Sequence, residues 1–290
     1  MGWCVYFYNR HKKIFDLKLI FLSGFCLKNV LLTIILRRFF LNRAHGMGTI
    51  HYFETLDSTN SYAVRHFDEL SDGDLVVAKA QTAGRGRLNR KWISKEGNLF
   101  ASFVIKEPFE EPFYATMVSS LSVVAAVKEL YPQVNPVIKW PNDVIIGEKK
   151  LCGILCEGVI REGKLNGIIC GIGVNLNLTE EELAAIDQPA ISLSVAAAEK
   201  INLKKFTDQL AIYLNWYYIT GNSHASELYR VWKDRNAIIG KIVNLLPPSG
   251  EVFSAKILDI GEDGRLIAER ENGEILYFSC GDVKMKPSNK

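Results

Sequence analysis

The sequence predicts an α+β fold, with a mixed, mostly antiparallel sheet and flanking helices, followed by a small C-terminal β-barrel. Three observations carry this prediction. Short apolar runs of strand length alternate irregularly with longer apolar segments of helical length. After Gly240 the chain changes to short strands separated by tight turns. The 290 residues are 48% hydrophobic and 23% charged, which permits a sizeable core and excludes wholesale disorder, collagen or a polytopic membrane protein.

The first 46 residues form a basic, apolar leader. They carry eight Lys and Arg against one acidic residue, Asp16, a net charge of +7, whereas the remainder carries 27 against 31, a net of −4. Within 19–36 the only charge is Lys28, which would be costly near the centre of a membrane span. We expect an upstream mis-called start with Met47 as the initiator, which mass spectrometry of the native N-terminus tests. The alternatives are that the leader is a basic membrane-surface anchor or a membrane-spanning helix.

Residues 47–236 are expected to form the α+β body. Asp57-Ser58 can cap the first helix, Tyr131-Pro132 ends the longest one, and Arg161-Glu162-Gly163-Lys164 predicts a hairpin. The expected strands are 50–53, 75–80, 99–105, 137–140, 144–146, 151–160 and 165–175, and the expected helices are 58–67, 113–130, 180–186, 193–200, 203–219 and 223–233.

Residues 237–290 are expected to form a separate small barrel of about five strands. Turns at Pro-Ser-Gly, Glu-Asp-Gly and Glu-Asn-Gly separate its apolar runs.

Several common kinds of site are excluded. The sequence has no Walker-type phosphate loop, no G-x-S-x-G, no H-E-x-x-H and no helix-turn-helix pattern. Its five histidines are scattered, and its six cysteines form no C-x-x-C pair. Cys152 and Cys156 are expected to be reduced core residues on one face of a strand, which suits a reducing cytoplasm.

A loop rich in glycine and arginine predicts an anion-binding site. Residues 81–92 read QTAGRGRLNRKW, in which Arg85, Arg87 and Arg90 offer forked donors for phosphate or carboxylate oxygens. The glycines allow a ligand to approach the backbone closely, and Trp92 can stack on a planar base. Together they suit an anionic, nucleotide-containing ligand. A solvated basic turn or an RNA-binding RG segment is the alternative.

Three further segments place polar or small residues near strand ends. KWPND at 139–143 combines a lysine, an amide and a carboxylate around a rigid turn. Lys150 begins a strand alongside it, where its charge can neutralise a phosphate in a transition state. GIGVNLN at 171–177 puts small residues in a central strand, which indicates close approach by a ligand or another backbone.

Taken in order, these segments resemble the biotin–protein ligases. The motifs are STN at 58–60, QxxGRGRxxRxW at 81–92, KWPND at 139–143, KxxGIL at 150–155 and GIGVN at 171–175, and the resemblance covers about Thr49 to Lys286. It implies a class II synthetase-like ligase core and an SH3-like C-terminal barrel. It also implies that biotin and MgATP form biotinyl-5′-AMP and pyrophosphate, and that biotin then passes to a lysine of the biotin carboxyl carrier domain of a carboxylase.

The resemblance further implies roles for individual residues. Lys150, Arg87 and Arg85 are expected to be catalytic, and the loop is expected to close over biotin and the adenylate, excluding water. Asp143 is the expected carboxylate linked to Mg²⁺, and no tightly bound metal is expected. The expected biotin contacts are Ser58, Thr59, Asn60, Gln81, Arg85, Gly86, Arg87 and Lys150, and the expected ATP or adenylate contacts are Arg90, Trp92, Asn142, Asp143 and Asn175.

One departure from the family pattern lies inside the loop, where Leu88-Asn89 replaces the Lys and Arg of many members. Because Arg85, Arg87 and Arg90 remain, we expect catalysis to survive. The leader carries no DNA-reading pattern, so the resemblance implies the monofunctional class, a cytoplasmic enzyme with no specific DNA binding. It is compatible with a homodimer formed through the sheet of the body.

Three other functions fit the sequence less well than biotin ligation. A lipoate–protein ligase also makes an acyl-adenylate, but the pairing of GRGRxxRxW with KWPND favours biotin. A non-catalytic biotin sensor or repressor is disfavoured by the retained Lys150. An RG-type RNA-binding protein is disfavoured by the low charge of the body.

Overall fold

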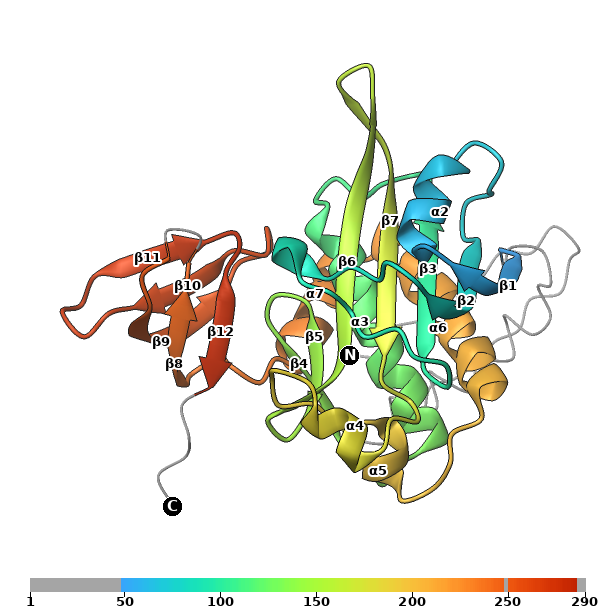
Figure 1. Ribbon diagram of the computed structural model, residues 1–290. Helices are drawn as coiled ribbons and strands as arrows, with labels where there is room; N and C mark the ends of the chain where they lie inside the picture. Colours follow the sequence, from blue (N-terminus) through green and yellow to red (C-terminus); the bar gives the residue numbers. More distant parts are fainter. Residues whose placement is uncertain (1–47, 248–249, 286–290) are drawn as a thin grey trace, which may run out of the picture. The chain divides into compact units, whose positions relative to one another are not determined.

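A computed structural model describes residues 48–247 and 250–285 (Figure 1). The leader and the predictions made for it lie outside the described residues. The described helices and strands are β1 Ile50–Leu56, α2 Thr59–Arg65, β2 Leu75–Gln81, the 3-10 turn η1 Arg87–Asn89, β3 Leu99–Ile105, α3 Phe113–Leu130, β4 Pro136–Lys139, β5 Asp143–Ile146, β6 Lys149–Arg161, β7 Lys164–Val174, α4 Glu180–Ala184, α5 Leu193–Ala197, α6 Leu203–Ser223, α7 Ala225–Lys233, β8 Ile242–Leu246, β9 Phe253–Ile260, β10 Leu266–Glu269, β11 Ile275–Phe278 and β12 Asp282–Met285.

The predicted α+β fold is confirmed. Seven strands form one sheet in the order β1-β2-β3-β7-β6-β5-β4. Only β1 and β2 pair in parallel, and the other neighbours pair antiparallel. The two longest strands, β6 and β7, occupy the middle of the sheet and continue beyond it as a hairpin (Figure 1).

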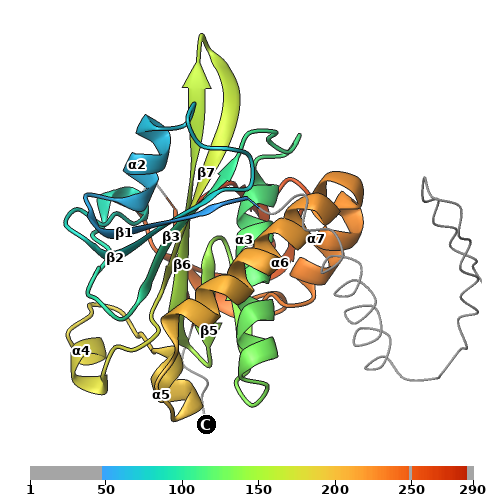
Figure 2. The same ribbon diagram turned by 90° about the vertical axis from the view of Figure 1, so that its right-hand side faces the viewer.

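Helices cover both faces of this sheet (Figure 2). α3, α6 and α7 pack on one face over the main core, whereas α2 lies on the other over a smaller cluster that includes Phe67, Val76 and Ile169. Alternation along the strands explains the division, since neighbours such as Ile168 and Ile169 point to opposite faces.

The long helix α3 has the bounds that the sequence predicts. By length and composition it is the one helix among the described residues that could cross a membrane, but two thirds of it is buried inside the protein. It packs against α6 and the central strands, so its apolar character reflects a core position.

Several helix ends differ from the predicted ones. α4 ends at Ala184 instead of residue 186, α5 ends at Ala197 instead of residue 200, and α7 begins at Ala225 instead of residue 223. α2 ends at Arg65, before the predicted Phe67, although Phe67 itself stays buried beneath it. α6 continues past the predicted end to Ser223. Packing sustains this last turn, because Gly221 lies so close to Phe109 and Leu228 that a methyl group there would meet both at about 3 Å.

The C-terminal residues form a separate antiparallel sheet of five strands in the order β11-β10-β9-β8-β12, as many as the sequence predicts. The indole of Trp140 donates to the carbonyl of Gly264 at 2.9 Å, and the hydroxyl of Tyr229 donates to that of Ile260. These bonds attach the β-rich domain to the end of the edge strand β4 and to α7. The domain boundary at 236/237 stays a prediction.

Candidate active site

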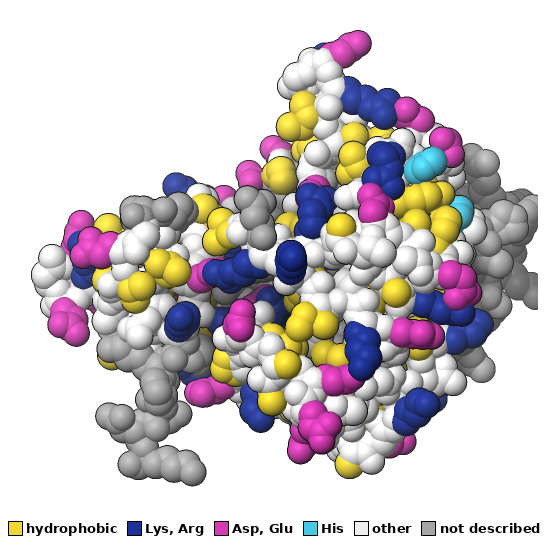
Figure 3. All heavy atoms as spheres, viewed as in Figure 1, with side chains coloured by type: hydrophobic (Ala, Val, Ile, Leu, Met, Phe, Trp, Pro, Cys, Tyr) yellow, Lys and Arg dark blue, Asp and Glu magenta, His cyan; other side chains and the backbone are white. Residues whose placement is uncertain are grey.

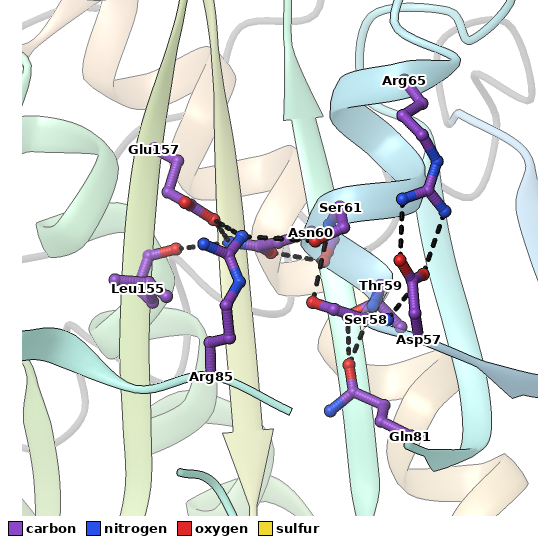
Figure 4. Close-up of polar contacts among 11 residues, drawn as sticks. Asp57, Ser58, Thr59, Asn60, Ser61, Arg65, Gln81, Arg85, Leu155 and Glu157 are labelled. Carbon is purple, nitrogen blue, oxygen red and sulfur yellow. Dashed lines mark hydrogen bonds and ion pairs between the residues drawn. The ribbon is translucent and has the colours of Figure 1, made fainter. Parts of the chain in front are cut away.

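The start of α2 gathers the residues predicted to face biotin. Ser58 caps the helix, its hydroxyl accepting from the backbone N–H of Ser61 at 3.5 Å. The backbone N–H and hydroxyl of Thr59 both donate to Oε1 of Gln81, at 2.8 and 3.3 Å (Figure 4). Although Gln81 is distant in sequence, the parallel pairing of β1 with β2 places it beside the helix start.

Asn60 is held by three protein partners. Its amide nitrogen donates to the carbonyl of Leu155 at 3.0 Å and to Oε2 of Glu157 at 2.7 Å, and its oxygen accepts from Ser102 at 2.6 Å. A methyl group on Gly171 would lie 2.4 Å from that oxygen, so the glycine makes room for the amide. Asn60 is therefore a fixed part of the site, and its predicted contact with biotin stays a prediction.

The Gly/Arg loop after β2 is folded back on itself. The backbone N–H of Gly86 donates to the carbonyl of Arg90 at 2.7 Å, and that of Trp92 donates to the carbonyl of Gly84 at 3.0 Å. Leu88 adopts a left-handed conformation, φ 53°, at the tip, and its side chain is exposed. These bonds close the loop between Gly84 and Trp92, with Leu88 at its tip.

Arg85 joins the loop to the predicted biotin side of the site. Its guanidinium donates to Oε2 of Glu157 at 2.9 Å and to the hydroxyl of Ser61 at 3.3 Å (Figure 4). The loop therefore contacts β6 and α2 through one side chain.

Arg87 and Arg90 join the loop to other parts of the chain. Arg87 donates to Oδ1 of Asn142 at 2.9 Å and to the carbonyl of Gly281 at 3.4 Å, and Arg90 forms an ion pair with Asp282. Asn142 belongs to the KWPND turn, whereas Gly281 and Asp282 belong to the C-terminal domain. A loop predicted to close over ligand is thus attached on both sides.

A cluster of charges lies at the ends of β4, β5 and β6. Nζ of Lys150 is 2.6 Å from Oδ1 of Asp143, and both side chains are more than four-fifths buried. Lys139 lies nearby, where burial lowers the pKa of its ammonium and Asp143 acts in the opposite direction. Figure 3 shows further Lys and Arg side chains in the middle of the face that the loop crosses. The cluster can accept an anionic ligand.

Trp92 covers the middle of the sheet beside this cluster. A methyl group on Gly173 would lie 2.5 Å from its indole, and one on Gly153 would lie 2.8 Å away, so only glycine leaves room for the ring. Nζ of Lys150 is 5.5 Å from the ring centroid, within cation–π distance. The indole Nε1 is buried with no hydrogen-bond partner in the described part of the chain, which leaves it free to donate to a ligand.

Asn142 and Asn175 donate hydrogen bonds to backbone carbonyls in the same region. The side chain of Asn142 donates to the carbonyl of Ile154 at 2.7 Å. The buried amide of Asn175 donates to the carbonyls of Lys150 and Ile191, at 3.4 and 3.3 Å. Both residues hold backbone around the lysine, and their predicted contacts with the nucleotide stay predictions.

The structure thus arranges the predicted residues in two groups joined by the loop. The first surrounds the start of α2, and the second surrounds Lys150. Sequence reasoning assigned no role to Glu157, Asp282 or Lys139. Glu157 follows KxxGIL by two positions and Lys139 opens KWPND, so both had a local signal. Asp282 had none, since it is 192 residues from the arginine it meets.

No cluster of three or more His, Cys, Asp or Glu side chains able to hold a metal occurs in the described ranges. A cavity of about 690 Å³ lies elsewhere, between the start of α3 and the β9–β10 turn. Glu110, Tyr114, Glu262 and Arg265 contribute to its wall, and it shares no residue with the predicted site.

Comparison with known proteins shows the class to which this fold and site belong. Residues 52–175 match the biotin/lipoate A/B protein ligase family, and residues 238–286 match the biotin protein ligase C-terminal domain. The chain is 32% identical over 240 residues to the bifunctional ligase/repressor BirA of Bacillus subtilis, covering 81% of this chain and 73% of that protein.

A solved structure and a further relative support the same class of protein. The biotin protein ligase from Aquifex aeolicus in complex with biotin and ATP superposes with a TM-score of 0.70 at 26% identity, covering 82% of this chain and 99% of that one. The biotin–[acetyl-CoA-carboxylase] ligase of Paracoccus denitrificans is 29% identical, covering 73% of this chain and 90% of that protein. The chain belongs to the biotin protein ligase family.

Proposed function

We propose that this chain is an ATP-dependent biotin–[biotin carboxyl-carrier protein] ligase. In the first step the carboxylate of biotin attacks the α-phosphate of ATP, which forms biotinyl-5′-AMP and releases pyrophosphate. In the second, the amine of a carrier lysine attacks the acyl carbon and AMP leaves. The names of its relatives support this activity, as does the complex of the Aquifex aeolicus protein with biotin and ATP.

The position of Lys150 carries the proposal. Two anions must approach each other in the first step, and their repulsion falls when a fixed positive charge lies between them. The ion pair with Asp143 fixes Lys150 at the start of β6. Arg87 donates a hydrogen bond to Asn142, the residue that precedes Asp143. We assign Lys150 and Arg87 to catalysis on this ground, and Arg85 because it belongs to the same Gly/Arg loop as Arg87.

Mg²⁺ would enter with ATP in this proposal. Mg²⁺ at nucleotide sites is commonly bound through phosphates and one or two carboxylates. Asp143 is the carboxylate beside Lys150, and its pairing with that lysine suits a shared role next to phosphate oxygens. When bound, the ion would neutralise phosphate charge and stabilise the departing pyrophosphate.

Lipoate ligation is the alternative within the same family model, which includes both kinds of enzyme. The match of the C-terminal residues to the biotin protein ligase C-terminal domain favours biotin. A non-catalytic biotin sensor would have no need of the Lys150–Asp143 pair.

Exchange of labelled pyrophosphate into ATP by the full chain tests the activity. We expect exchange to depend on biotin. Exchange with lipoate or octanoate, and none with biotin, would establish the alternative substrate. Binding of biotin without any exchange would support a sensor.

We extend the proposal to the setting of the enzyme. The acceptor would be a lysine in the biotin carboxyl carrier domain of a carboxylase. The enzyme would work in the cytoplasm, where its four described free cysteines stay reduced, and would bind no specific DNA. It could pair through its sheet as a homodimer. Sedimentation with and without biotin tests pairing, and a mobility-shift assay tests DNA binding.

A further inference from the structure

We propose that Glu157 is a positioning residue that couples the biotin-facing segment to closure of the Gly/Arg loop. The inference rests on the proposed function, since it concerns how the enzyme retains its adenylate. Glu157 lies on β6, its side chain is 28% exposed, and none of the roles assigned above includes it.

One oxygen of Glu157 receives two donors from different parts of the chain. Oε2 accepts from the amide of Asn60 at 2.7 Å and from the guanidinium of Arg85 at 2.9 Å (Figure 4). Asn60 belongs to the STN segment at the start of α2, whereas Arg85 belongs to the loop. The carboxylate is therefore the point at which the two meet.

The Asn60 half of this arrangement is rigid. The carbonyl of Leu155 and the hydroxyl of Ser102 fix the amide, and Asn60 is 4% exposed. The amide in turn fixes Oε2 where Arg85 must reach it. Ordering of the STN segment therefore positions the acceptor for Arg85. Closure of the loop in turn stabilises the STN segment, because such coupling is reciprocal.

The contact between Arg85 and Glu157 is the part of this arrangement that can break when the loop opens. The guanidinium side chain is 47% exposed, and its second partner is the hydroxyl of Ser61 at 3.3 Å, a longer and neutral bond. The charged bond to Glu157 is the stronger of the two. Removing the charge of Glu157 while keeping its shape should therefore loosen the loop and leave Asn60 in place.

Glu157→Gln and Glu157→Ala separate the two halves. Glutamine keeps an oxygen for the amide of Asn60 and loses the charge that holds Arg85, whereas alanine loses both contacts. The matched control is Glu54→Gln, which removes an exposed carboxylate from its pair with Lys79 on the outer strands of the same sheet. All variants are made in the full chain, and their thermal midpoints are compared with that of the wild type.

Retention of the adenylate is the decisive readout. Protein is loaded with biotin and ATP labelled in the α-phosphate, separated from free nucleotide, and followed by filter binding. We expect Glu157→Gln to release adenylate roughly tenfold faster than wild type, with the KM for biotin nearly unchanged. Glu157→Ala should also raise the KM for biotin, and Glu54→Gln should match the wild type.

Arg85→Gln supplies the second test. If the two side chains act as one contact, the double variant Arg85→Gln/Glu157→Gln should release adenylate no faster than the quicker single variant. Release from Glu157→Gln at the wild-type rate would overturn the inference, as would single-variant effects that multiply in the double variant. Failure of wild-type protein to form any adenylate from biotin would instead overturn the proposed function.

Discussion

The chemistry of the proposed first step depends on the charge of Lys150. Lys150→Ala should reduce biotin-dependent pyrophosphate exchange on the order of 10²- to 10³-fold, because a fixed charge acts where charge develops. Biotin affinity should fall much less, since the STN segment and Gln81 remain. Isothermal titration and exchange kinetics measure the two effects.

The neighbouring lysine provides the control for this variant. Lys149 is exposed and begins the same strand, so Lys149→Ala should retain wild-type exchange. Unchanged turnover in Lys150→Ala would remove that lysine from the mechanism.

Arg87 is expected to retain the adenylate by holding the loop against Asn142. Arg87→Gly should let biotinyl-5′-AMP escape and acylate lysines on bystander proteins, which a blot of a mixture of carrier and serum albumin detects. Lys91→Gly is the control, because Lys91 lies in the same loop and its side chain is exposed. A variant at Arg87 that still labels the carrier alone would contradict the closure role.

Single residues also show what sequence reasoning could reach. The motifs identified Lys150, Asp143 and the arginines, because their spacing is unusual outside this family. They could not show that the amide nitrogen and oxygen of Asn60 already have protein partners, since Ser102 lies on β3 and Leu155 and Glu157 lie on β6. Hydrogen-bond partners of this kind depend on strand register, which motifs do not reveal.

At the scale of elements, the hairpin of β6 and β7 forms the floor of the site. Gly173→Ala should push the indole of Trp92 off that floor, because the new methyl group would lie 2.5 Å from it. We expect the KM for ATP to rise several-fold and the free energy of unfolding to fall by about 1–3 kcal/mol, typical of overpacking.

A second glycine in the hairpin is the control. At Gly158 the new methyl group would meet only the end of Leu165, a flexible side chain that is 39% exposed. Gly158→Ala should leave the KM for ATP unchanged. An ordinary KM in Gly173→Ala would show that Trp92 does not cover the nucleotide.

The bounds of helices and strands are predicted well where an apolar run coincides with the element. They are predicted less accurately where contacts with distant parts of the chain determine where the element ends. β3 has its predicted bounds because all of it is buried, and α3 has its predicted bounds because its apolar run coincides with the helix. The end of α6 depends on Phe109, which is distant in sequence and packs against Gly221. The parallel pairing of β1 with β2 likewise follows from the crossover through α2, which local patterns do not specify.

At the scale of the whole molecule, the C-terminal domain takes part in holding the loop. Asp282→Asn should weaken the ion pair with Arg90 and speed adenylate release about threefold, a modest effect because Arg90 is 56% exposed. The filter-binding assay measures it. Asp263→Asn, which removes the exposed pair with Arg265 inside the same domain, should have no effect. Equal release rates in both variants would separate the C-terminal domain from loop closure.

The central claim is that the chain makes biotinyl-5′-AMP and passes its biotin to a carrier lysine. The most direct measurement loads the full chain with biotin and ATP labelled in the α-phosphate, then adds a carrier domain. We predict that protein-bound biotinyl-5′-AMP accumulates without carrier, and that each adenylate discharged yields one AMP and one biotinylated carrier lysine. Absence of biotin-dependent bound adenylate, or discharge without biotinylation of the carrier, would contradict the account.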